Sequence, residues 1–149
     1  MDYLADTNIL LRFVNVNDPE HPLVADVVKG PLQRGESLQY TQQNRRAFWN
    51  VCTRPANRNG LGYSIEAALL RLAEADAVFS RLPDLAAAGP MWDRLVKQYR
   101  VQGTAVHDAQ LVATMLAHGI NRILTLNIAD FARYSEVAAV HPQAENSAK

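Results

Sequence analysis

The segment Leu4-Ala5-Asp6-Thr7-Asn8 decides the fold class, because a short apolar run ends at an aspartate and a helical pattern follows at once. Two later segments repeat this arrangement, Val106-His107-Asp108-Ala109 and Leu126-Asn127-Ile128-Ala129-Asp130-Phe131. In open α/β sheets, functional side chains gather at the carboxyl ends of parallel strands. We therefore expect the three aspartates to lie together at one edge of a parallel sheet.

Apolar runs that alternate with helical patterns predict a three-layer α/β/α sandwich, with a mainly parallel sheet covered on both faces. The predicted strands are residues 3–5, 37–40, 104–106, 122–126 and 137–140. The predicted helices are residues 8–14, 22–28 or 22–32, 41–53, 64–82, 91–100, 108–118 and 128–134. We expect one domain over residues 1–141 and a polar, disordered tail over 142–149.

Bulk composition narrows the function classes. The 149 residues are 48% hydrophobic and 20% charged, which favours a globular chain over a disordered one. Fifteen basic and fifteen acidic residues give a net charge of zero, so any nucleic-acid contact must come from a local patch.

The single cysteine, Cys52, excludes an intrachain disulfide and a thiolate zinc site. No apolar run approaches the ~18 residues of a membrane span, and Asp2 stands where a signal peptide is basic; we expect a cytoplasmic protein without a membrane partner.

A cluster of carboxylates favours a divalent-metal site. Each aspartate alone could cap a helix, and that interpretation stays open for each of them. Three carboxylates held together repel one another unless a cation neutralises them. Hard cations such as Mg²⁺ and Mn²⁺ prefer oxygen ligands, and they support phosphoryl displacement by activating water. Other chemistries fit less well, because the sequence has neither a glycine-rich phosphate loop nor a Gly-x-Ser-x-Gly turn.

Together these segments resemble a PIN domain and, more narrowly, the VapC-type ribonuclease toxins of bacterial toxin–antitoxin pairs. The matching stretches are residues 6–8, 48–55, 107–109 and 127–134, and the resemblance extends from Met1 to Val140. It implies that Asp6, Asp108 and Asp130 bind Mg²⁺ or Mn²⁺ and that the enzyme cleaves single-stranded or loop RNA. It also implies supporting hydrogen bonds from Thr7, Asn8 and Asn127, a small antitoxin partner and a homodimer.

Ala47 departs from the family pattern. The resemblance places a fourth acidic residue, a glutamate, directly before Phe48-Trp49, and this chain has alanine there. A methyl group cannot bind a cation, orient a water or accept a proton, so we expect activity to be weakened or absent. The alanine is either a natural weakening or a deliberate inactivation, and the sequence does not distinguish them.

Two alternatives to a ribonuclease stay open at the level of sequence. One is a non-catalytic module that keeps the fold in order to bind RNA or protein. The other is a small-molecule phosphohydrolase, which would need a closed pocket. Arginines that line the rim of the site would favour RNA, because they would hold the phosphates of an extended strand. The candidates are Arg12, Arg45, Arg46, Arg54 and Arg58.

Overall fold

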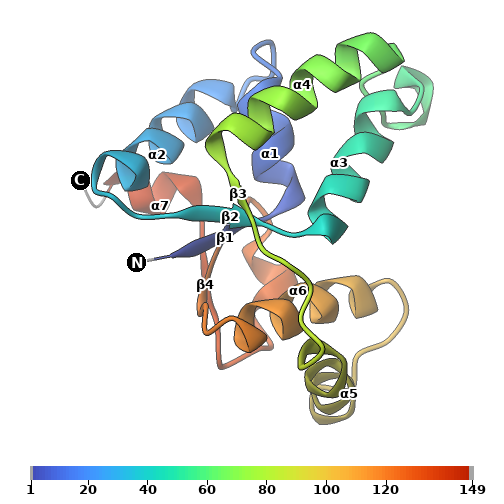
Figure 1. Cartoon of the computed structure of the whole chain (residues 1–149), viewed down its shortest axis with the longest axis vertical. Helices are drawn as coiled ribbons and strands as arrows, with labels where there is room; N and C mark the ends of the chain where they lie inside the picture. Colours follow the sequence, from blue (N-terminus) through green and yellow to red (C-terminus); the bar gives the residue numbers. More distant parts are fainter. Residues whose placement is uncertain (1, 148–149) are drawn as a thin grey trace.

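A five-stranded parallel sheet organises the chain in the computed structural model, which describes residues 2–147 (Figure 1). The strands are β1 (Tyr3–Ala5), β2 (Leu38–Tyr40), β3 (Ser80–Arg81), β4 (Arg122–Leu124) and β5 (Ala138–Val140). Their order in the sheet is β3-β2-β1-β4-β5, and every pairing is parallel. The central position of β1 puts Asp6, the residue after it, at the middle of the carboxyl edge of the sheet.

Helices cover both faces of this sheet. The α-helices are α1 (Thr7–Val14), α2 (His21–Gln33), α3 (Gln42–Thr53), α4 (Ile65–Val78), α5 (Ala88–Gln98), α6 (Ala105–Ala117) and α7 (Pro142–Ser147). Two 3₁₀ helices, η1 (Ala56–Arg58) and η2 (Ile128–Phe131), lie in the connections.

Two apolar cores confirm the predicted three-layer sandwich. Successive strand side chains point to opposite faces, so Tyr3 and Ala5 pack in one core and Leu4 packs in the other. The first core also contains buried residues of α1, α2, α3 and α4, while the second contains residues of α5, α6 and η2. The fold class expected from the sequence is therefore confirmed.

One predicted strand is wrong and one strand was missed. Residues 104–106 do not form a strand: a turn at Gly103, with a positive φ of 61°, leads directly into α6, and the Val106 amide bonds to the Gly103 carbonyl. A three-residue apolar run suits a buried helix start as well as a strand, and periodicity does not separate the two. The missing strand is β3, which lies within the predicted helix 64–82 and has only two residues.

The polar tail begins with a helix. Residues 142–147 form α7, which packs against α2, where disorder was expected. Pro142 suits the first turn of a helix, and the Gln143 amide donates to Nδ1 of His141 at 3.0 Å. The last two residues of the predicted tail, 148 and 149, lie outside the described residues. Within residues 2–147, every helix is too short or too polar to cross a bilayer.

Candidate metal and phosphoryl-transfer site

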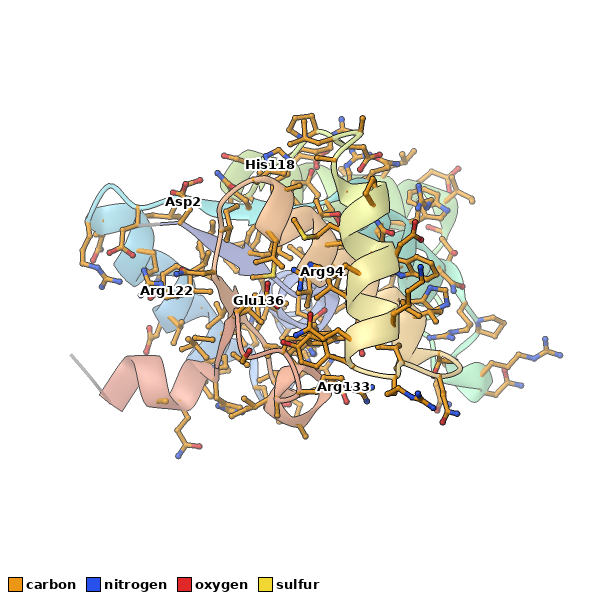
Figure 2. All side chains as sticks on the ribbon, turned by 90° about the horizontal axis from the view of Figure 1, so that it is seen from below. Asp2, Arg94, His118, Arg122, Arg133 and Glu136 are labelled. Atoms are coloured by element: carbon orange, nitrogen blue, oxygen red, sulfur yellow. The ribbon has the colours of Figure 1, made fainter. Side chains whose placement is uncertain are left out.

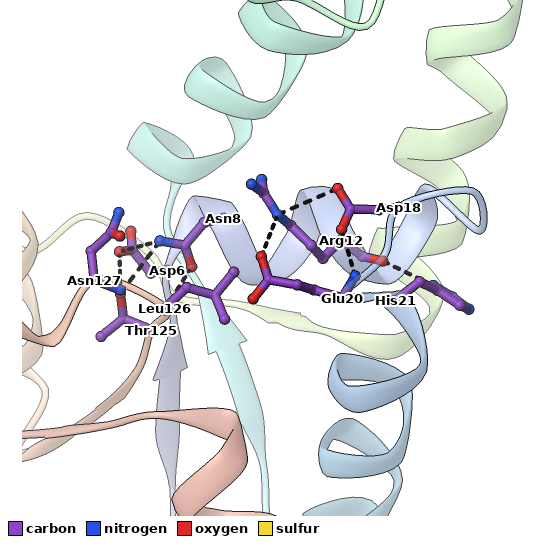
Figure 3. A network of polar contacts seen from close by, with 9 residues as sticks. All are labelled: Asp6, Asn8, Arg12, Asp18, Glu20, His21, Thr125, Leu126 and Asn127. Carbon is purple, nitrogen blue, oxygen red and sulfur yellow. Dashed lines mark hydrogen bonds and ion pairs between the residues drawn. The ribbon is translucent and has the colours of Figure 1, made fainter.

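Asp6 is fixed by hydrogen bonds at the end of β1 (Figure 3). Its Oδ1 accepts from the Thr7 amide at 2.8 Å, which makes Asp6 the N-cap of α1. Its Oδ2 accepts from the Thr125 hydroxyl at 2.8 Å and from Asn8 Nδ2 at 3.3 Å. Burial raises the pKa of Asp6 above its ordinary value, and the charge of Asp130 adds to that effect, while these hydrogen bonds oppose it. Asp6 is therefore both a helix cap and a desolvated carboxyl beside another acidic group.

Asn8 and Thr125 connect Asp6 to the segment that follows β4 (Figure 3). The Asn8 carbonyl oxygen accepts from the Leu126 amide at 3.2 Å, and the Asn127 amide donates to the Thr125 hydroxyl at 3.0 Å. Asn127 thus takes part through its backbone. Sequence analysis missed Thr125, although a buried hydroxyl that interrupts the apolar run 122–126 was a usable signal.

Asp108 lies in the first turn of α6 and does not follow a strand. It is not the N-cap, because Thr104 occupies that position and makes no side-chain capping bond. Burial, together with the nearby charges of Asp6 and Asp130, raises the pKa of Asp108 to about 6. The carboxylates of Asp6 after β1, of Asp108 on α6 and of Asp130 on η2 therefore share one electrostatic environment, although they come from distant parts of the chain.

Asp130 lies on η2, at the exposed side of this environment. The chain that follows η2 is joined to α5, since Glu136 accepts from Arg94 at 2.7 Å (Figure 2). Glu136 also accepts from the hydroxyl of Tyr99, the residue after α5, at 3.2 Å. The rings of Tyr99 and Tyr134 also pack edge to face, 5.0 Å apart. These contacts join the segment after η2, the element that carries Asp130, to α5 and Tyr99.

Ala47 lies on α3 between contacts to the other two helices of the site. Asn44, three residues earlier, donates from Nδ2 to the Thr7 hydroxyl at 3.0 Å. Gln43, four residues earlier, donates from Nε2 to the His107 carbonyl at 2.9 Å. Helix residues at these spacings share a face, and a side chain leans over the preceding turn. Helix geometry therefore predicts that a side chain at position 47 points between the start of α1, beside Asp6, and the start of α6, beside Asp108.

The acidic groups are electrostatically coupled but are not gathered around one point. Within the described residues, no three side chains of the Asp, Glu, His or Cys type lie close enough to hold a metal ion together.

The pKa of Asp108 predicts a stability cost in the metal-free protein. Folding raises the pKa of Asp108 from 3.8 to about 6, so the folded protein pays no penalty for this carboxyl below about pH 4, where it is protonated in both states. As the pH rises through 6, the carboxyl must ionise in the folded protein, and free energy of unfolding is lost. At about 1.4 kcal/mol per pKa unit, reduced for solvent screening, the cost at pH 7.5 is roughly 1–2 kcal/mol. Asp108→Asn should be more stable by that amount in urea unfolding at pH 7.5 with EDTA, and equal to the unmodified chain at pH 4.

The exposed Asp93 of α5 supplies the control, because Asp93→Asn should change stability little at either pH. If Asp108→Asn were instead less stable at pH 7.5, the interaction of the carboxylate with the N-terminus of α6 would outweigh its desolvation.

The architecture is the PIN-like α/β/α fold, and solved VapC-type structures share it. VapBC2 from Rickettsia felis, bound to a DNA fragment from their promoter, matches with a TM-score of 0.67 and 14% identity, over 95% of this chain and 98% of that chain. VapBC-1 from nontypeable Haemophilus influenzae matches with a TM-score of 0.67 and 15% identity, over 96% and 99%. Mycobacterium tuberculosis VapC20, a Sarcin-Ricin loop cleaving toxin, matches with a TM-score of 0.56 and 18% identity, over 81% and 86%.

At these identities the likeness is one of fold. The sequence itself matches no protein-family model and no curated protein.

Proposed function

We propose that this chain is a VapC-type ribonuclease toxin whose catalytic centre is weakened by the alanine at position 47. The observation that carries the proposal is the coupling of Asp6, Asp108 and Asp130 at one edge of a VapC-like sheet. Three mutually repelling carboxylates reduce stability, and such a cost is expected where a site serves function. The substrate in this proposal is single-stranded or loop RNA.

Mg²⁺ or Mn²⁺ fits the donor chemistry of this site. Carboxylate oxygens suit these ions, and Mg²⁺ is commonly held by one or two carboxylates and several waters. Asp6, Asp108 and Asp130 would hold the ion partly through bridging waters, since their carboxylates are not gathered around one point within residues 2–147. The ion would supply water activation and charge neutralisation at the phosphate. Thr7, Asn8 and Thr125 would keep Asp6 oriented, since they already bond its carboxylate or the residues beside it. The lack of a three-carboxylate cluster within residues 2–147 and the alanine at 47 both favour weak affinity.

A non-catalytic binding module is the second candidate, and Ala47 is the specific observation that favours it. A chain that kept the fold and lost the ability to assemble the cation site would bind RNA or protein without cleaving either. A ribonuclease with a metal site should be stabilised by Mn²⁺, whereas a binding module without one should not. The melting temperature distinguishes the two proposals.

A small antitoxin protein is the proposed partner. The similar solved structures include the VapBC2, VapBC-1 and FitAB complexes. The structures of VapBC2 and FitAB also contain a DNA fragment. On this chain, α4 exposes three large apolar side chains, Ile65, Leu69 and Leu70, each more than half exposed. Apolar side chains gathered on one exposed helix are typical of a surface that another protein covers. We also propose that the protein forms a homodimer and that it acts in the cytoplasm.

Mn²⁺ should raise the melting temperature of the unmodified chain, because a cation that binds only the folded state stabilises it by mass action. Near saturation at 100 times the dissociation constant, this amounts to about 2.7 kcal/mol, or a few degrees. The measurement is a thermal melt with Mn²⁺ from 0 to 20 mM, with Asp6→Asn as the site variant and Asp93→Asn as its control. An identical response of all three proteins would overturn the metal site and leave the binding module.

A further inference from the structure

A cavity of about 510 Å³ lies between α3, α5 and α6 and the segment that precedes α5. Two of its lining residues directly precede site positions, since Arg46 precedes Ala47 and His107 precedes Asp108. The cavity therefore borders the acidic site without containing its carboxylates. Its volume falls within the range of 300–1,000 Å³ that is typical of small-ligand pockets.

One side of the cavity is aromatic and apolar. Trp92 of α5 lines it, together with Leu85 and Ala88. The indole N–H of Trp92 donates to the Val106 carbonyl at 3.1 Å, and this bond fixes the orientation of the ring. Fixed aromatic rings are the surfaces on which proteins stack unpaired nucleobases.

Gln43 of α3 also lines the cavity, and its side-chain oxygen has no hydrogen-bond partner among residues 2–147. Gln43 donates through Nε2 to the His107 carbonyl, while its Oε1 is buried and accepts from no donor among residues 2–147. A buried acceptor without a partner is costly. Because this oxygen is out of reach of solvent, a donor in the cavity would bond it only after the Gln43 amide turns toward the cavity. Amide side chains of this kind bond the edges of unstacked bases.

The charges at this cavity favour a neutral group inside and a phosphate outside. Arg46 is exposed and forms no ion pair within the described part of the chain. By contrast, Arg12 lies 3.6 Å from Asp18, and Arg45 lies 2.6 Å from Asp76, so both of those cations are engaged. Asp84 also lines the cavity, and its carboxylate would repel a phosphate that entered. A neutral base can enter while Arg46 contacts the phosphate attached to it.

We propose that this cavity receives one unstacked nucleobase of the RNA strand whose backbone passes Arg46 toward the acidic site. The proposal rests on the proposed function, and it adds a base-binding determinant outside the carboxylates. Recognition of an unstacked base would restrict the site to single strands and loops, because a base within a duplex cannot reach the cavity.

Gly89→Leu tests this proposal, because Gly89 lines the cavity and a Cβ built there meets no heavy atom within 4 Å. A leucine there would extend without obstruction from the lining of the cavity, and leucine favours a helix more than glycine does. Its matched control is Ala87→Leu, at an exposed position that does not line the cavity. Binding of a fluorescent eight-nucleotide RNA is measured by anisotropy in EDTA, which prevents cleavage. Gly89→Leu should bind at least ~5-fold more weakly than the unmodified chain, as expected for one lost stacked base, and Ala87→Leu should bind equally.

Abasic RNAs identify the nucleobase as the occupant. Each nucleotide is replaced in turn by an abasic ribose, and one position should weaken binding to the unmodified chain but not to Gly89→Leu. Equal affinities of the unmodified chain and Gly89→Leu would overturn the cavity proposal and leave the ribonuclease proposal standing. The same result with a changed sedimentation coefficient would assign the cavity to an interface between copies. Absence of RNA binding by the unmodified chain would overturn both proposals.

Discussion

Ala47→Glu is expected to raise Mn²⁺-dependent RNA cleavage at least ~100-fold over the unmodified chain. The α3 face that carries position 47 lies between the contacts of Asn44 with α1 and of Gln43 with α6. A carboxylate there would approach both Asp6 and Asp108 and would complete the ligand and proton-accepting set. Single catalytic groups of this kind are worth about 10²–10⁴ in rate. The measurement is single-turnover cleavage of a labelled single-stranded RNA with excess protein.

Ala47→Gln is the matched control, because glutamine has nearly the same size and helix preference as glutamate and carries no charge. It should stay at the rate of the unmodified chain. Cleavage raised equally by both substitutions would attribute the gain to packing at α3. Equal cleavage by the unmodified chain and by Ala47→Glu would mean that the three aspartates suffice.

Asp6→Asn, introduced together with Ala47→Glu, is expected to remove at least ~100-fold of the restored rate. Residues that act as one catalytic unit lose most of the rate when any one of them is removed. Asparagine keeps the oxygen that accepts from the Thr7 amide, and it is as good an N-cap as aspartate, so α1 should be retained. The cleavage assay above gives the rate, and circular dichroism with a thermal melt verifies the fold.

Asp93→Asn in the same background should leave the rate unchanged, since that side chain is exposed on α5. A loss of rate accompanied by a fall of many degrees in melting temperature would assign Asp6 a structural role. An unchanged rate with an intact fold would remove Asp6 from the catalytic set.

The sequence predicted the central part of the fold because its signals there are local. Strand β1 was predicted with its observed bounds, and Asp6 was predicted to follow it. A short apolar run followed by an N-cap residue and a helical pattern is typical of a strand that leads into a helix. The error at residues 104–106 has a physical cause, because three apolar residues can equally begin a helix that packs against the sheet. Strand β3 could not be found, since its two exposed residues pair with β2 only through backbone hydrogen bonds.

In the candidate site, too, features with a local sequence signal could be predicted and features that depend on tertiary contacts could not. Aspartates were identifiable from their chemistry, but the residues that orient them were less so. The role of Asn44 could not be predicted, because its place in the capping box of α3 already accounts for it. Its hydrogen bond from Nδ2 to Thr7 forms only through the tertiary structure. Gln43 and the cavity beside it depend on how α3, α5 and α6 meet, which no local pattern encodes.

The most direct test of the central claim, that position 47 belongs to the acidic site, is the Mn²⁺ affinity of three proteins measured by isothermal titration calorimetry. These are the unmodified chain, Ala47→Glu and Ala47→Gln, titrated without RNA so that binding is independent of activity. Loss of even an outer partner of a metal ligand commonly costs 10–100-fold in affinity, so a direct carboxylate should contribute at least as much. We predict that Ala47→Glu binds Mn²⁺ at least ~10-fold more tightly than the other two, which should be equal. The same affinity in all three proteins would contradict the claim.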